Sequence, residues 1–153
     1  MKIRKAYSWD MREVYEMICL LEEKNLNWKQ FKDCYQRQQN NENMFCLVIE
    51  ERGKIIACLN LRMEYQLHHA DKIAEIMEFC VCEEKRSEGI GKMMFDYAAE
   101  LAKQQGCGKI ELCTNQLRVD AHRFYEKQGM NNFHYKFSKN LKGSEPKKNQ
   151  LGT

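Results

Sequence analysis

One helical pattern and the two strands beside it constrain the fold of this chain more than any other feature. Apolar side chains recur with the spacing of one helix face, and they are Ile90, Met93, Met94, Tyr97, Ala98, Leu101 and Ala102. The preceding run KIAEIMEFCVC has apolar residues on both faces, as a central strand has, and KIELC follows the helix as another strand. A strand–helix–strand unit implies a parallel crossover, so we expect a sheet with a helix packed on its face.

The first half of the chain adds further strands and helices to this unit. A short strand opens the chain, and two helices follow it, of which the first starts at Ser8 or Asp10. The β-rich runs MFCLVIE and KIIACLNLRMEY are separated by ERG and predict a hairpin. After KIELC we expect a short helix capped by Asp120 and a last strand over 131–141. The sequence therefore predicts an α/β fold whose central mixed sheet is flanked by about four helices.

Length and charge limit the class of protein. The chain has 153 residues and a formal net charge of +3, with acidic and basic residues interleaved. We therefore expect one domain over 1–141 with a polar tail at 142–153, and no stripe of positive charge for nucleic acid. No apolar run reaches about 18 residues, so no membrane-spanning helix is expected. The N-terminal residues also lack the apolar centre of a signal peptide.

The cysteines have no spacing typical of a disulfide framework or a zinc site. The chain has eight of them and no C-x-x-C pair, and most lie inside apolar runs such as MFCLVI and IIACLNL. Free cysteine is one of the residue types most often buried in proteins. We interpret these residues as free, mostly buried thiols of a cytoplasmic protein.

The turn EEKRSEGIGKMM, between the central strand and the long helix, has glycines typical of a phosphate-binding loop. A dinucleotide-binding motif would need a third glycine where Met94 stands, and a P-loop would need serine or threonine at Met93. What is left is Arg86-x-x-Gly89-x-Gly91 at the start of a helix, where backbone amides bind anions and the arginine can add a charged contact. The alternative is a plain strand-to-helix turn.

The segment KIAEIMEFCVCEEKRSEGIGKMMFDYAAELAKQQG resembles the central motif of the GCN5-related N-acetyltransferases, the GNAT family. The segment KIELCTNQLRVDAHRFYEKQGM is similar to the next motif of that family. The resemblance implies a GNAT-like acyl-CoA N-acyltransferase fold, acetyl-CoA as donor and a primary amine as acceptor. Within residues 57–141, the runs LHHADKIAEIMEF, DAHRFY and HYKFSKNL resemble the aminoalkylphosphonate N-acetyltransferase branch.

The resemblance also implies which residues contact acetyl-CoA. In this family the glycine loop binds the pyrophosphate, and the end of the central strand pairs with the pantetheine arm. The residues implied are Phe79, Cys80, Val81, Arg86, Ser87, Glu88, Gly89, Ile90, Gly91, Lys92, Asn115 and Tyr125. One backbone amide of 79–81 is then expected to polarise the thioester carbonyl.

Acetyl transfer to an amine needs a base for the ammonium proton and an acid for the departing thiolate. Glu78 and, as the alternative, Glu75 lie just before the loop and are the candidate bases. They have opposite parity in an ideal strand, so one would face away unless the bulge that the resemblance implies is present. Tyr125 is the candidate acid by resemblance. The competing interpretations are solvent-facing carboxylates and a core aromatic ring.

The acceptor is less constrained than the donor. An aminoalkylphosphonate is anionic at one end, so its site needs cationic groups or a divalent metal, which the resembling branch is associated with. The candidate residues are Arg62, His68, His69 and His134. Adjacent histidines in an extended segment point apart, so His68 and His69 are not expected to chelate together. The alternatives are another small amine, a protein amine, or a non-catalytic acyl-CoA sensor. GNAT proteins often dimerise, and the sequence leaves a homodimer open.

Overall fold

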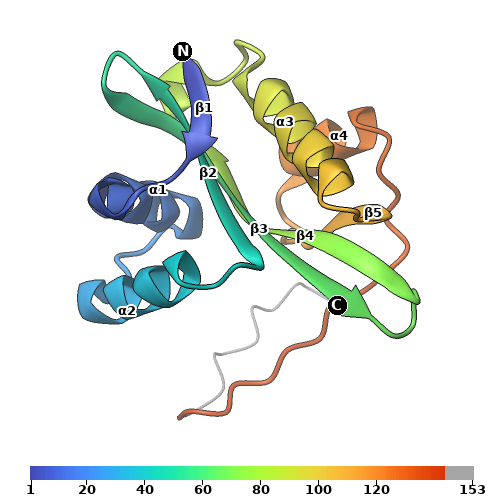
Figure 1. The fold of residues 1–153 in the computed structure, drawn as a ribbon. Coiled ribbons are helices and arrows are strands. Elements are labelled where there is room, and N and C mark those ends of the chain that lie inside the picture. Colours follow the sequence, from blue (N-terminus) through green and yellow to red (C-terminus); the bar gives the residue numbers. More distant parts are fainter. Residues whose placement is uncertain (144–153) are drawn as a thin grey trace. The chain divides into compact units, whose positions relative to one another are not determined.

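The computed structural model describes residues 1–143, which form two compact units (Figure 1). The first unit is Met1–Cys113, and the second begins at Thr114. The elements of the first unit are β1 (Lys2–Lys5), the 3-10 helix η1 (Ser8–Asp10), α1 (Met11–Glu22), α2 (Trp28–Gln39), β2 (Met44–Glu51), β3 (Lys54–Gln66), β4 (Asp71–Val81), the 3-10 helix η2 (Glu83–Lys85), α3 (Ile90–Gln104) and β5 (Lys109–Leu112). The second unit contains α4 (Val119–Lys127).

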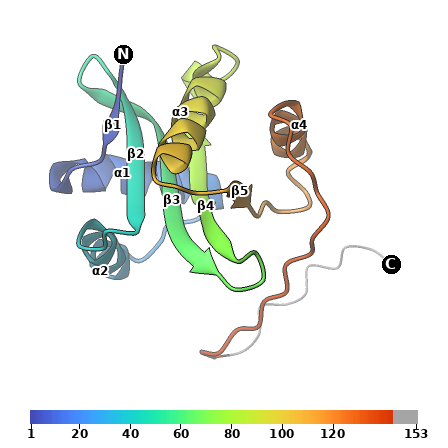
Figure 2. The same cartoon turned by 45° about the vertical axis from the view of Figure 1, so that its right-hand side comes forward.

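The first unit is built on a five-stranded sheet in the order β1-β2-β3-β4-β5 (Figure 2). Strands β1 to β4 pair antiparallel, and β5 pairs parallel with β4, with α3 as the crossover between them. The mixed sheet and the crossover predicted from the sequence are therefore confirmed. The ERG turn joins β2 to β3, and Arg52 and Gly53 both have positive φ angles, of 51° and 76°. This left-handed pair matches the twist of a tight hairpin.

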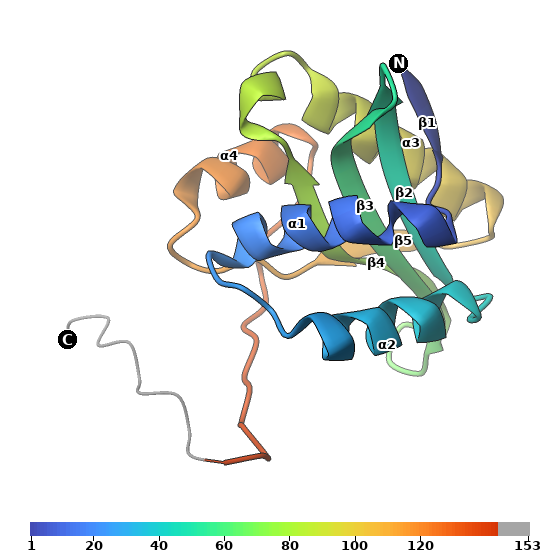
Figure 3. The ribbon, with the colours of Figure 1, turned by 90° about the vertical axis from the view of Figure 1, so that its left-hand side faces the viewer.

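Helices α1 and α2 cover one face of this sheet, and α3 covers the other (Figure 3). Between α1, α2 and the sheet lies a cluster of buried side chains. It contains Val14, Met17, Ile18, Tyr35, Val48, Ile55 and Cys58. On α3 the buried residues are Ile90, Met94, Phe95, Ala98 and Ala102. Met93 and Tyr97 are 41% and 43% exposed, so the buried stripe of α3 is narrower than its apolar pattern predicts.

The start of α4 differs from its sequence prediction. The helix begins at Val119, so Asp120 lies in its first turn and is not the N-cap. The turn before the helix is formed by Asn115, whose Oδ1 accepts a hydrogen bond from the Leu117 amide at 2.9 Å. The Asn115 carbonyl also accepts from the Arg118 amide at 3.0 Å, which starts the helix before Asp120 is reached.

Residues 131–141 form neither a helix nor a strand, although their alternating pattern predicts a last strand. Phe133, Tyr135 and Phe137 occupy alternate positions and are 79%, 81% and 92% exposed. A strand is stable only when paired, and none of the strands in the described part of the chain pairs with this segment. The predicted tail at 142–153 lies, after residue 143, outside the described residues.

All eight cysteines lie in the described part and are free thiols. Two of them face each other on neighbouring strands of the sheet, where the sulfurs of Cys58 and Cys80 are 3.2 Å apart. No helix within residues 1–143 combines the length and the apolar character needed to cross a bilayer.

Candidate active site

A β-bulge in β4 decides which way the two candidate bases point. On β3, Asn60 pairs with Glu78 and Arg62 pairs with Glu75, and the register shifts between them so that Met77 is an extra residue. Asn60 and Arg62 are two residues apart and face the same side of β3. The bulge therefore places both carboxylates on one face of the sheet, a face that they would not share in an unbroken strand.

Glu78 is held in a polar cluster between the sheet and α2. The Asn60 Nδ2 group donates hydrogen bonds to Glu78 Oε2 and to Gln38 Oε1, both at 2.8 Å. Burial raises the pKa of Glu78; the Asn60 hydrogen bond lowers it in part, and the negative charge of Glu22 raises it further. A half-buried carboxyl with a raised pKa is suited to accept a proton at a reaction centre.

Glu75 is held differently, in an ion pair. Arg62 Nη2 donates to Glu75 Oε2 at 2.8 Å and lies 3.3 Å from Glu64 Oε1. In register with Glu75 on the other side of β4 lies Glu111 of β5. Glu75 therefore has charged neighbours across the sheet, Arg62 and Glu111, whereas the hydrogen-bond partner of Glu78 is the neutral Asn60 amide.

On β3, two buried polar atoms of this face have no hydrogen-bond partner among the described residues. They are Asn60 Oδ1, an acceptor, and Arg62 Nε, a donor. Asn60 as a whole is only 8% exposed. Buried polar groups are almost always paired in folded proteins, so an acceptor and a donor without partners mark a place for a polar ligand.

The two adjacent histidines lie in the turn between β3 and β4. His69 Nε2 is 2.9 Å from Glu111 Oε1, and the ring centroids of His68 and His69 are 4.2 Å apart. The prediction that these rings point apart is wrong, because the segment is a turn and not an extended strand. His134 belongs to the second unit and is exposed.

A divalent metal does not fit the side chains of residues 1–143. No group of three or more histidine, cysteine, aspartate or glutamate side chains in this part of the chain is arranged to hold one. Glu111 pairs with His69, and Glu75, which is in register with Glu111, pairs with Arg62.

The glycine turn leads directly into α3. Its backbone is left-handed at two positions, Ser87 with φ 67° and Gly89 with φ 79°. The Arg86 side chain is exposed and folds back, so that its Nε donates to the Val81 carbonyl at 3.3 Å. The other predicted loop residues are Glu88, which is exposed, and Ile90, Gly91 and Lys92, which form the first turn of α3. The first amides of a helix have no partner within the helix and can bind an anion.

β4 extends beyond β5 on the side of this turn. β5 pairs with β4 only from Ile73 to Ile76. β4 then continues to Val81, and residues Phe79 to Val81 still pair with β3. The strand end predicted to contact the pantetheine arm is therefore the stretch that runs past β5, where an extended ligand can add as a strand.

Asn115 and Tyr125 lie in the second unit. The Asn115 carbonyl oxygen is 2.9 Å from His122 Nε2, in addition to its role in the turn before α4. The ring centroid of Tyr125 is 5.3 Å from that of Phe124 in an edge-on contact. Burial raises the pKa of Tyr125 to about 12, against the opposing positive charge of Arg118. The phenol therefore keeps its proton at neutral pH.

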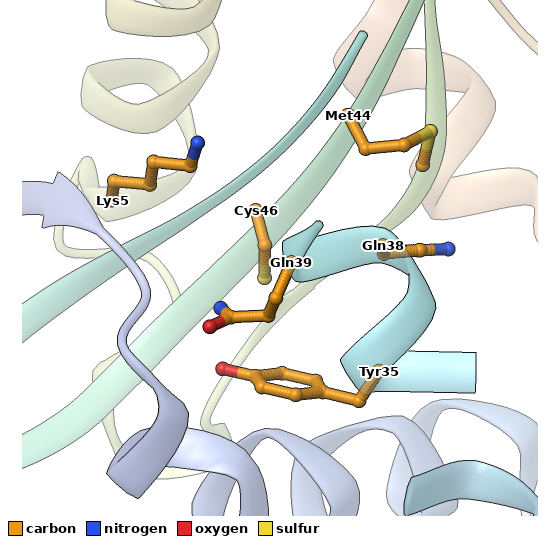
Figure 4. A pocket seen from close by; sticks show the side chains of 6 residues that line it. All are labelled: Lys5, Tyr35, Gln38, Gln39, Met44 and Cys46. Carbon is orange, nitrogen blue, oxygen red and sulfur yellow. The ribbon is translucent and has the colours of Figure 1, made fainter. Parts of the chain in front are cut away.

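Asn60, Gln38 and Glu111 are site residues that the sequence does not predict. A signal for Asn60 is present, because it is the one polar residue in the run IIACLNL. Gln38 belongs to a polar helix and gives no such signal. Besides contacting Asn60, it lines a small hollow beside α2 together with Lys5, Tyr35, Gln39, Met44 and Cys46 (Figure 4). In that view the Gln38 side chain extends away from Tyr35 and Gln39.

Comparison with known proteins assigns the family. The sequence profile of the Acetyltransferase (GNAT) family matches residues 3–130. The chain belongs to the GNAT family. An aminoalkylphosphonate N-acetyltransferase of Salmonella typhimurium is 34% identical over 140 residues, which cover 92% of this chain and 91% of that protein. This GNAT protein is therefore an N-acetyltransferase, and acetyl-CoA is the donor that the family uses.

Solved structures confirm the GNAT-like fold. A transcriptional regulator from Bacillus halodurans has a TM-score of 0.84 and 24% identity, with 92% of this chain and 99% of that chain covered. Glucosamine-6-phosphate N-acetyltransferase from Arabidopsis thaliana has a TM-score of 0.75 and 27% identity, with 92% and 97% covered.

Proposed function

We propose that this GNAT enzyme acetylates the primary amine of an aminoalkylphosphonate by direct transfer from acetyl-CoA, with Glu78 as base and Tyr125 as acid. The observation that carries the choice of base is the half-buried Glu78 carboxyl, which Asn60 holds on the bulge and whose pKa burial raises. Glu75 is the weaker candidate because its carboxylate is paired with Arg62. The 34% identical aminoalkylphosphonate N-acetyltransferase supports the choice of acceptor.

The proposed reaction has three steps that named groups of this chain carry. The amides of 88–92 and the Arg86 side chain bind the pyrophosphate, and the backbone of 79–81 holds the thioester and polarises its carbonyl. Glu78 takes a proton from the ammonium group, and the amine nitrogen attacks the carbonyl carbon. The carbon–sulfur bond then breaks, and Tyr125 donates its proton to the thiolate. The second proton, which the nitrogen loses as the amide forms, restores the Tyr125 phenol, and Glu78 releases its proton to solvent. The products are an N-acetyl amide and CoA. Asn115 is proposed to contact the CoA arm.

Arg62 is the proposed partner of the phosphonate. Its Nη2 is engaged by carboxylates, but its buried Nε–H has no partner among the described residues and can donate to a phosphonate oxygen. His68 and His69 lie in the turn between β3, the strand of Arg62, and β4, and are proposed to contact the phosphonate there, with His134 as a further candidate. We also propose that residues 1–141 act as one cytoplasmic domain, since the family profile spans residues of both units.

A panel of amines tests the proposed function. The protein is incubated with acetyl-CoA and aminomethylphosphonate, 2-aminoethylphosphonate, ethanolamine or a lysine peptide, and free thiol is followed. We expect fastest release with the phosphonates. No turnover with either phosphonate would overturn the proposed acceptor. If CoA raises the melting temperature and yet no amine is acetylated, the protein is an acyl-CoA sensor, since a ligand that binds the native state must stabilise it.

Replacement of Tyr125 by phenylalanine is expected to lower kcat about tenfold or more, because the thiolate would leave without a proton donor. The dissociation constant for acetyl-CoA should change little, since the ring is retained. Tyr135→Phe is the matched control, because Tyr135 is also in the second unit and is 81% exposed. An unchanged rate for Tyr125→Phe would remove this residue from the reaction.

Gly89→Val is expected to weaken CoA binding about tenfold, measured by calorimetry. No atom lies within 4 Å of a Cβ added at Gly89, so the cost comes from its φ of +79°. A side chain makes that conformation unfavourable by about 1–2 kcal/mol, and the loop would relax away from its binding shape. Gly53→Val is the matched control, because Gly53 has φ +76° and equally open space but lies in the β2–β3 turn. Equal loss of CoA binding in both variants would contradict the assignment of the loop.

A further inference from the structure

The orientation of the Asn60 amide is fixed by its neighbours. Its Nδ2 group lies 2.8 Å from two acceptors, the Glu78 carboxylate and the Gln38 side-chain oxygen. A rotated amide would place its oxygen against both acceptors, so Oδ1 must point elsewhere. Oδ1 is buried and has no donor among the described residues. A buried acceptor left without a donor costs about 1–3 kcal/mol, which a bound donor would recover.

We propose that Asn60 Oδ1 accepts a hydrogen bond from the amine of the acceptor and that Arg62 Nε–H donates one to its anionic group. Each charged end of the substrate then has one partner on β3. The inference rests on the proposed function and deepens it, since it assigns one partner to each end of a zwitterion. Glu78 and Asn60 lie opposite each other on β4 and β3, so one ammonium group can donate to both. Asn60 is then a binding residue for the group that reacts.

The spacing of the two unpartnered atoms fits a short substrate. Asn60 and Arg62 are at i and i+2 on one face of β3, so their Cα atoms are about 7 Å apart. An acceptor atom for the ammonium and a donor atom for an anion thus stand side by side along the strand. This arrangement selects amines whose anionic group is a few bonds from the nitrogen. An amine without the anion would use the Asn60 position alone.

Kinetics of three variants with two acceptors test this assignment. The acceptors are 2-aminoethylphosphonate and ethanolamine, which have the amine in common and differ in the phosphonate. Asn60→Leu should raise KM for both acceptors about tenfold, because both lose the amine contact. Arg62→Leu should raise KM for the phosphonate acceptor by a similar factor and leave KM for ethanolamine within about threefold. Gln39→Leu is the matched control, because Gln39 is the neighbouring amide of α2 and donates to the Ala6 carbonyl at 3.0 Å, away from the Asn60 hydrogen bonds. KM for either acceptor should then stay within about threefold.

A second substitution at Asn60 separates a loss of substrate binding from a loss of folding. Asn60→Asp keeps an acceptor oxygen in place and adds a carboxyl beside Glu78, so KM for the amine should rise less than in Asn60→Leu. The acid limb of kcat/KM should also move to higher pH, because two neighbouring carboxyls disfavour ionisation. A purely structural role predicts equal damage in both variants and no such movement of the limb.

The outcomes separate this inference from the proposed function. If the wild-type protein acetylates no amine, the proposed function fails and this inference fails with it. If the wild-type protein acetylates 2-aminoethylphosphonate but Asn60→Leu keeps the wild-type KM for both acceptors, the inference alone is overturned. Selective loss in Arg62→Leu with general loss in Asn60→Leu supports it.

Discussion

Glu78→Gln is expected to lower kcat by about 10²–10⁴-fold, the usual contribution of a positioned general base. Glutamine has almost the same shape, and its side-chain oxygen can still accept the hydrogen bond that Asn60 Nδ2 donates to Glu78 at 2.8 Å. It cannot take a proton from an ammonium group. The dissociation constant for acetyl-CoA should therefore remain near the wild-type value while turnover falls, which steady-state kinetics and calorimetry can separate.

Glu75→Gln is the matched control for this prediction. Both glutamates lie on the same face of β4 because of the bulge at Met77, but Glu75 is engaged by Arg62. We expect a loss of less than about tenfold from Glu75→Gln, since an ion-paired carboxylate is a poor general base. A larger loss in Glu75→Gln than in Glu78→Gln would exchange the roles of the two residues.

The pH dependence gives a further test of Glu78. A base acts only when deprotonated, so kcat/KM falls as the pH drops through the pKa of Glu78. Burial raises this pKa, and the Asn60 hydrogen bond lowers it only in part. The acid limb should therefore lie at higher pH than for an ordinary exposed glutamate. In Glu78→Gln this limb should be replaced by a rise near the pKa of the free amine, because the variant can acetylate only an amine that is already deprotonated.

The elements that the sequence predicts well are those with strong local signals. The strand–helix–strand unit follows from the apolar stripe of α3, and the hairpin follows from ERG, because both depend on residues close in sequence. The strand at 131–141 shows the limit of such reasoning. Alternation at Phe133, Tyr135 and Phe137 describes one chain segment, but a strand also needs a partner, which alternation does not report.

The candidate site also contains one part with a local sequence signal and one part that depends on residues far apart in the sequence. The loop Arg86-x-x-Gly89-x-Gly91 is visible as a motif because its function depends on local backbone geometry. The hydrogen bonds among Gln38, Asn60 and Glu78 cannot be seen as a sequence motif. They join α2, β3 and β4 through side chains that are 18 and 22 residues apart in the sequence. Their geometry also depends on one extra residue in β4. Parity counted along an ideal strand assigns Glu75 and Glu78 to opposite faces, and the bulge reverses that result.

Arg4→Met is expected to lower the free energy of unfolding by about 3–5 kcal/mol at neutral pH, the usual cost of removing one partner from a buried ion pair. Arg4 Nη1 and Nη2 donate to the two carboxylate oxygens of Asp10 at 2.7 and 3.0 Å, and Arg4 Nε donates to Glu50 at 2.8 Å. The Asp10 side chain is 4% exposed. Among the described residues, this buried charge would keep the Tyr7 amide as its remaining donor without Arg4. Urea denaturation measures the loss, and the double variant Arg4→Met with Asp10→Leu should recover at least part of it.

The pH dependence of stability should change sign in this variant. In the wild-type protein, burial acts to raise the pKa of Asp10, but the hydrogen bonds from Arg4 and Tyr7 and the charge of Arg4 outweigh it, so that the pKa is lowered. A lowered native pKa contributes stability above the unfolded pKa, and this stability is lost as the pH falls below about 4. In Arg4→Met, Asp10 is still buried but has lost the hydrogen bonds and the positive charge of Arg4 that lower its pKa. The pKa of Asp10 should therefore rise above its ordinary value. Acidification from neutral pH towards pH 5 should then stabilise the variant relative to the wild-type protein, because protonation removes the unpaired charge. A constant stability difference between pH 5 and pH 7 would show that Arg4 acts through packing and not through Asp10.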